Sequence, residues 1–121
     1  MNYESTELIN SQCLPGVWFR VRRMSLGRRL ELSIEIGKLL RPHEFHAAGA
    51  QLPDQVEAAR LALEIEHTYL RWGVCEVGGL DIDGQQPDVT ALIERGPEEL
   101  VREILGAVKH QCGLSDDERK N

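Results

Sequence analysis

Residues 17–23, VWFRVRR, constrain the fold more than any other stretch, because apolar and polar positions alternate along them. An extended chain would place Trp18, Arg20 and Arg22 on one face and three apolar side chains on the other, a period typical of a half-buried strand. A weaker strand candidate lies at residues 4–10, and a Pro-Gly turn separates the two. The sequence therefore predicts an amino-terminal β-hairpin.

The spacing of the apolar residues becomes helical after residue 24. Ser25 is a suitable N-cap, and Pro42 is expected to kink or end this first helix, with HEFHAAGAQ either a helical continuation or a loop. Pro53 predicts the start of a second long helix, and Gly73 predicts its C-cap. The apolar positions of the first helix are Leu26, Leu30, Leu32, Ile34, Ile36, Leu39 and Leu40.

The second helix carries two apolar stripes instead of one. A helix with apolar side chains on two faces is expected to be central and packed on two sides. The first stripe is formed by Val56, Ala59, Leu63 and Leu70, and the second by Leu61, Ile65, Tyr69 and Trp72.

Residues 74–87 are rich in glycine and predict a small β-hairpin or loop. Two turn signals, Gly78–Gly79 and Asp83–Gly84, flank short alternating runs. A calcium loop starting at Asp81 would need glycine at its sixth position and glutamate at its twelfth, where this chain has glutamine and leucine. Turn chemistry is therefore the better interpretation.

The carboxy-terminal part predicts two further helices. Asp88 caps the first, Gly96 breaks it, and Gly113 ends the second. A capping box at Ser115 and Glu118 predicts a final turn that frays.

The expected architecture is a single domain over residues 1–121 with an α+β, mainly helical fold. About four helices follow the amino-terminal hairpin, with the glycine-rich segment as a small insertion. The expected parts are the β-hairpin at 1–23, two long helices at 25–73, the hairpin or loop at 74–87, helices at 88–113 and a frayed tail at 114–121.

Charge is unevenly distributed along the chain. The net charge is −6, yet residues 1–29 carry five arginines and only two glutamates, so the rest of the chain is strongly acidic. An acidic body is a poor non-specific binder of phosphates, because it repels the nucleic-acid backbone. This balance favours a protein partner over nucleic acid.

The arginines allow three interpretations. They could pair with the acidic body of the same chain. A strand carrying tryptophan and arginine could instead stack nucleic-acid bases, although such binding surfaces usually have more than one exposed aromatic side chain. They could also form a partner-facing strip, since tryptophan and arginine are enriched at binding hot spots. The candidate partner-binding residues are Trp18, Arg20, Arg22, Arg28 and Arg29.

The sequence contains no recognisable catalytic, cofactor-binding or metal-binding pattern, so we expect no enzyme activity. His43 and His46 could share a helix face, but only Glu44 is close enough in sequence to join them, and a solvated helix end is the preferred interpretation. The three cysteines form no CxxC pair and are expected to stay reduced. The chain has no apolar run long enough for a membrane span and no basic, apolar leader, which predicts a cytoplasmic protein.

Three segments carry a resemblance to a known family. They are PGVWFRVRRMSLGRRLEL, EIEHTYLRWGVCEVGGLDIDG and LIERGPEELVREILGAVKHQCGLSDDERKN. In this order and spacing the chain resembles the tail assembly chaperones of long-tailed phages and prophages. The matching residues are Ser25, Arg28, Arg29, Glu31 and Leu32; Trp72, Gly73 and Val74; Gly96, Pro97, Glu99 and Leu100; and Leu114, Ser115, Glu118, Lys120 and Asn121.

The resemblance implies a non-catalytic role in the cytoplasm of a bacterial host. Proteins of this family bind the tape measure protein and help to recruit tail tube subunits, and then leave the finished particle. A tape measure protein is long, helical and apolar, so it needs a soluble cover. A protein that coats such a partner is also expected to self-associate. The alternatives are a structural tail adaptor or completion protein that stays in the virion and, ranked third, a nucleic-acid-binding regulator.

Overall fold

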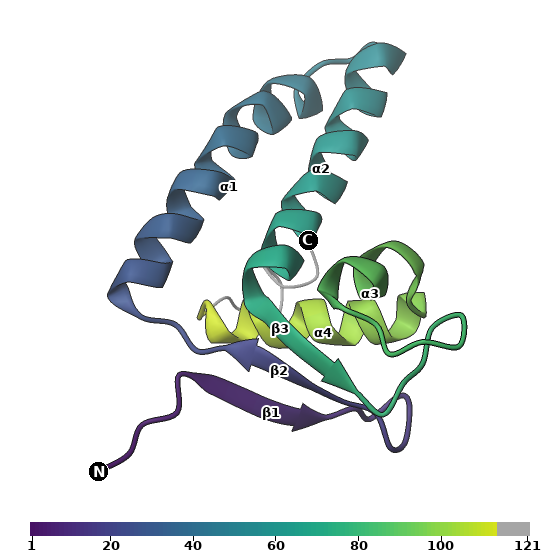
Figure 1. The fold of residues 1–121 in the computed structure, drawn as a ribbon. Helices are drawn as coiled ribbons and strands as arrows, with labels where there is room; N and C mark the ends of the chain where they lie inside the picture. Colours follow the sequence, from purple (N-terminus) through teal and green to yellow (C-terminus); the bar gives the residue numbers. More distant parts are fainter. Residues whose placement is uncertain (114–121) are drawn as a thin grey trace. The chain divides into compact units, whose positions relative to one another are not determined.

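The computed structural model describes residues 1–113 and confirms the predicted α+β, mainly helical fold (Figure 1). These residues divide into two compact units. The first consists of residues 1–24 and 70–113, and the second of Ser25–Tyr69. The capping box predicted at Ser115 and Glu118 lies outside the described residues.

The first unit is built on a three-stranded antiparallel sheet with strand order β1-β2-β3 (Figure 1). The strands are β1 (Thr6–Asn10), β2 (Trp18–Arg22) and β3 (Val74–Gly78). The predicted hairpin is present, with Asn10 opposite Trp18 and Thr6 opposite Arg22. β2 therefore lies at the centre of the sheet, where both of its edges are paired.

The predicted separate hairpin at 74–87 is wrong in its first half. Val74–Gly78 pairs instead with β2 and becomes the third strand of the amino-terminal sheet. Only the second half turns on itself, because Ile82 and Gln85 exchange backbone hydrogen bonds of 2.8 and 3.1 Å. Asp83 and Gly84, both with positive φ, form the two-residue turn between them, as the Asp-Gly signal predicted.

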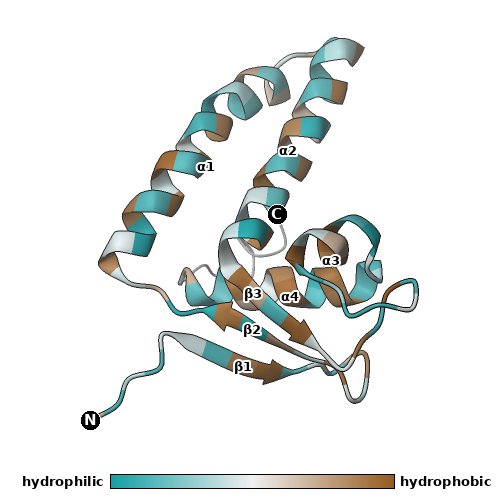
Figure 2. Ribbon diagram, viewed as in Figure 1, coloured by the Kyte–Doolittle hydropathy of each residue, from teal (hydrophilic) through white to brown (hydrophobic). Residues whose placement is uncertain are grey.

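The core of this unit lies between one face of β2 and the last helix. Val17, Phe19 and Val21 are buried, as their alternation predicted, and Phe19 is fully inaccessible. The two helices here are α3 (Val89–Arg95), capped by Asp88 as predicted, and α4 (Glu98–Gln111). Figure 2 shows apolar positions on the ribbon of α4 and, among polar ones, on the strand β2. The buried side chains of α4 include Leu100, Ile104, Leu105 and Val108.

Gly73 is needed for close packing and not for a helix cap. The predicted end of the second helix at Gly73 is confirmed, because Gly73 is the last residue of α2, but its φ is not positive as in a left-handed cap. A Cβ atom at this position would lie 2.3 and 2.6 Å from the two methyl carbons of Val108. The missing side chain therefore lets the helix end approach α4.

We expect Gly73→Ala to lower the free energy of unfolding by about 1–3 kcal/mol, because the new methyl group overpacks the core against Val108. Val108→Ala should relieve that clash. A double-mutant cycle measured by urea unfolding should therefore show a favourable coupling of about 1 kcal/mol or more between the two substitutions. Strictly additive effects would contradict the packing explanation.

The second unit is an antiparallel helical hairpin (Figure 1). It contains α1 (Leu26–Ala47) and all but the last turn of α2 (Leu52–Gly73). Ser25 caps α1 as predicted, since its side chain accepts a hydrogen bond from the backbone N–H of Arg28. Pro42 does not end α1, and the alternative of a helical continuation is confirmed as far as Ala47. A 2.9 Å hydrogen bond between the side chains of His46 and Asp54 ties this last turn to α2.

The expectation that α2 is packed on two sides is wrong for most of its length. Leu61, from the second predicted stripe, is buried, but Val56 and Leu63 of the first stripe are 62% and 59% exposed. Only Leu70, at the other end of the first stripe, is buried. One face of α2 therefore remains open to solvent over its first three turns.

Candidate partner-binding surfaces

The five predicted partner-binding residues fall in both units. Trp18, Arg20 and Arg22 share the outer face of β2, opposite to the buried Phe19 face. Arg28 and Arg29 lie in the first turn of α1, in the helical hairpin. The predicted partner-facing strip therefore consists of one group of residues in the first unit and another group in the second unit.

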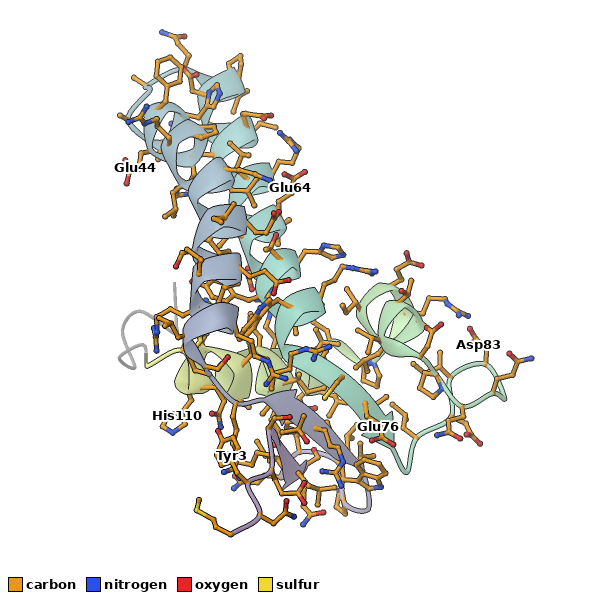
Figure 3. All side chains as sticks on the ribbon, turned by 60° about the vertical axis from the view of Figure 1, so that its left-hand side comes forward. Tyr3, Glu44, Glu64, Glu76, Asp83 and His110 are labelled. Carbon is orange, nitrogen blue, oxygen red and sulfur yellow. The ribbon has the colours of Figure 1, made fainter. Side chains whose placement is uncertain are left out.

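The two arginines on β2 contact other residues of the first unit. Arg20 forms an ion pair with Glu76 of β3, with 3.4 Å between Nε and the carboxylate. Glu76 is labelled in Figure 3. Arg22 donates a 2.9 Å hydrogen bond from its Nε to the backbone carbonyl of Trp72. The Arg20–Glu76 contact agrees with the interpretation in which arginines pair with the acidic body, whereas Arg22 contacts a backbone carbonyl.

Trp18 gives the outer sheet face its aromatic character. Its ring lies so close over Gly78 of β3 that a Cβ there would sit 2.2 Å from ring carbons. Leu8 of β1 is on the same side of the sheet and is 46% exposed. Beside them is an open hollow of about 340 Å³ lined by Trp18, Gly78, Gly79, Leu80, Asp81 and Gln86. This face offers a small contact area for another protein.

The larger apolar surface lies on the helical hairpin and consists of residues that the sequence did not predict as partner-binding. On α1 the exposed residues Leu26, Leu30 and Ile34 follow each other at four-residue spacing, so they lie on one face. The stripe continues through Gly37 and Arg41 to Phe45, which is 73% exposed. We call this set the α1 outer stripe.

A second exposed stripe runs along α2. Leu52, Val56, Ala59 and Leu63 are spaced by three or four residues, and all four are exposed. We call this set the α2 outer stripe. The opposite face of the same helix carries Leu61, which is buried. The exposed stripe is therefore a second apolar face of α2, separate from the face that packs in the core.

The sequence contains the signal for these surfaces. The helical spacing of apolar residues predicts one apolar set that contains exposed Leu26, Leu30 and Ile34. The same set also contains Leu32 and Ile36, which are buried in the structure. The two sets lie about half a turn apart, so one helix carries two apolar faces. Figure 2 shows apolar bands along both helices of the hairpin.

Charged side chains flank the α2 outer stripe. Arg60 forms ion pairs with Glu57 and Glu64, one turn away on either side. The hydrogen bond from Arg60 lowers the pKa of Glu57. The apolar stripe is thus bordered by a solvated, mixed-charge edge, an arrangement common at the rim of a protein interface.

A compact polar cluster joins the β1–β2 loop to α4. The Glu103 carboxylate accepts hydrogen bonds from the Ser11 hydroxyl at 2.6 Å, the Gln12 backbone N–H at 2.7 Å and the Cys13 thiol at 3.2 Å. Burial opposes the charged form of Glu103, but these hydrogen bonds outweigh it and lower its pKa. For Cys13, the Ser11 hydroxyl favours the thiolate, yet burial and the Glu103 charge raise the pKa overall. A thiol held in its protonated form is a weak nucleophile, so this cluster is suited to fixing a loop.

We expect Glu103→Gln to lower the free energy of unfolding by about 1–2 kcal/mol at pH 7, because charge-assisted hydrogen bonds become neutral ones. The folded-state pKa of Glu103 is below its unfolded value, so its stabilisation is complete above the unfolded pKa and is lost as the pH falls through the folded one. Urea unfolding should therefore show a clear difference from the wild type at pH 7 that shrinks toward pH 3. Glu94→Gln, at an exposed carboxylate on α3, is the control. A difference that is equally large at both pH values would contradict this assignment.

Among residues 1–113, no three histidine, cysteine or acidic side chains come together as a metal-binding group. His46, predicted as a solvated helix-end residue, contacts Asp54 instead of a ligand set. None of the helices in this range is both long and apolar enough to cross a membrane. Comparisons with known protein families, with curated proteins and with solved structures found no match.

Proposed function

We propose that this protein is a non-catalytic tail assembly chaperone of a long-tailed phage or prophage, which binds the tape measure protein and helps to recruit tail tube subunits in the host cytoplasm. The observation that carries the proposal is the pair of exposed apolar stripes on the helical hairpin of a chain with net charge −6. Contiguous exposed apolar patches on a soluble protein mark interaction sites. The family resemblance in the sequence supplies the class of partner.

The α2 outer stripe is the primary surface in this proposal. Its residues at three- and four-residue spacing form a row that matches the apolar face of another amphipathic helix. A tape measure segment docked there would bury its own apolar face against Val56 and Leu63, while the acidic surface of the chaperone keeps the complex soluble. The outer sheet face at Trp18 and the arginines at the start of α1 are candidates for additional contacts.

Co-expression with the tape measure protein of the same phage tests the proposal. We expect the tape measure protein to stay in the soluble fraction with this chain and to precipitate without it. Equal solubility in both cases would overturn the proposal. Mass spectrometry of purified particles separates it from the tail adaptor alternative, because a chaperone is absent from the particle and an adaptor is present.

DNA retention separates the proposal from a nucleic-acid regulator. That regulator should bind DNA with a steep salt dependence that is reduced by arginine substitution. Since Arg20 and Arg22 are held by Glu76 and by a backbone carbonyl, we expect no retention at moderate salt.

A further inference from the structure

We infer that the α1 outer stripe is the contact surface of a symmetric, antiparallel homodimer, in which α1 of one chain packs against α1 of a second copy. The inference goes beyond the proposed function, since it concerns the purified chain alone. It rests on three properties of α1, namely its exposed apolar side chains, its charge pattern and its central glycine.

The apolar part of the stripe is long enough to hold a second helix. Leu26, Leu30, Ile34 and Phe45 are 88%, 64%, 53% and 73% exposed, and they span about 28 Å along the helix. Together they offer on the order of 500 Å² of apolar surface per chain, below the ~800 Å² per partner of a standard stable interface. We therefore expect a dimer that forms and dissociates with concentration.

The charges beside the stripe are self-complementary only when the second helix runs in the opposite direction. Arg29 and Glu44 lie at equal distances on either side of a point between residues 36 and 37, and so do Glu35 and Lys38. A two-fold axis at this point brings each charge of a pair opposite its counterpart in the second copy. In a parallel pair every charge would instead lie beside its own copy, which is repulsive.

The same axis also accounts for the one charge inside the stripe. Arg41 stands between Gly37 and Phe45 on the apolar face. In the antiparallel pair Arg41 comes opposite Glu31 of the second copy, because the midpoint between residues 31 and 41 lies within one residue of the centre of symmetry. Glu35 and Lys38 already form a 3.1 Å ion pair within one chain, so the dimer would unite two such pairs into an alternating cluster of four charges.

Gly37 lies directly beside the centre of symmetry and is exposed. A glycine in the middle of a helix destabilises it relative to alanine, and a Cβ added at Gly37 would meet no atom of the chain within 4 Å. Packing within the chain therefore does not require a glycine there. On a two-fold axis each residue faces its own copy, and the absence of a side chain lets two backbones approach closely.

Engineered cysteines test both the interface and its direction. Gly37→Cys should form a disulfide-linked dimer under mild oxidation, because the two copies of residue 37 face each other within the 4.4–6.8 Å range of Cα separations in disulfides. Gly27→Cys is the matched control, since it is also an exposed α1 glycine with no atom within 4 Å of an added Cβ. In the antiparallel dimer its two copies lie about 28 Å apart along the axis, so they should not cross-link. The wild-type chain controls for the three native cysteines, and far-UV circular dichroism checks that each variant folds.

Sedimentation of the wild-type chain gives an independent readout. We expect a concentration-dependent monomer–dimer equilibrium that Ile34→Glu shifts to monomer, whereas Gln85→Glu, at an exposed turn of the other unit, leaves it unchanged. Lys38→Glu should weaken the dimer, and Glu35→Lys combined with Lys38→Glu should restore it. A wild-type chain that stays monomeric at all concentrations, or cross-linking at residue 27 as fast as at residue 37, would overturn the inference. Either failure would leave the co-expression result for the tape measure protein unaffected.

Discussion

If this protein acts as the proposed chaperone, replacing both Val56 and Leu63 by glutamate should abolish its effect on the solubility of the tape measure protein, while the chain itself stays folded. Both side chains are more than half exposed, so their removal leaves no cavity in the core. In a complex, however, each new carboxylate would be buried against an apolar helix without a partner. We expect the affinity to fall at least about 100-fold.

The matched control adds the same two charges to the same part of the chain. Gln51 directly precedes α2 and Gln55 lies in its first turn. Both are exposed and outside the α2 outer stripe, so Gln51→Glu with Gln55→Glu should leave tape measure solubility unchanged. Thermal unfolding of both double variants should remain close to the wild type. If the two double variants solubilise the partner equally well, the α2 outer stripe is not the binding surface.

Phe19→Ala should destabilise the protein more than truncation of any exposed apolar side chain. Phe19 is fully buried on the central strand, with neighbours in β1 and β3 on either side. Its loss leaves a cavity between the sheet and α4, which costs about 3–5 kcal/mol. Since small proteins have a total stability of about 5–15 kcal/mol, we expect a large fraction of the variant to be unfolded at 37 °C.

Leu8→Ala is the control for Phe19→Ala. Leu8 lies on the opposite face of the same sheet and is 46% exposed, so its truncation should cost less than about 1 kcal/mol. Urea unfolding followed by circular dichroism measures both variants. A similar loss for the two would mean that the sheet has no single buried face.

Local patterns in the sequence are sufficient to predict most of the elements. The alternation around Phe19 identifies the buried face of β2, and the caps at Ser25 and Asp88 place two helix starts. These features are readable because a period of two or a capping side chain acts within a few residues. The place of β3 in the same sheet is not readable in this way, because β3 pairs with a strand more than 50 residues earlier and no local pattern encodes that partner.

The apolar surfaces escape prediction for a related reason. The periodicity of Leu26 and Val56 shows that these residues share a face with other apolar residues, but it does not say what covers that face. Treating every apolar stripe as core predicts an α2 packed on two sides, where the structure leaves Val56 and Leu63 open. Likewise, a glycine at the end of a helical pattern predicts a cap, whereas the contact of Gly73 with Val108 comes from a distant helix.

Site-specific photo-crosslinking in cells that also express the tape measure protein tests the central claim most directly. A benzophenone side chain at Leu63, on the α2 outer stripe, should cross-link to the tape measure protein, whereas the same group at Gln85, in the exposed turn of the other unit, should not. Cross-links from Gln85 and none from Leu63, in a complex that still co-purifies, would contradict the claim that this helix face holds the partner.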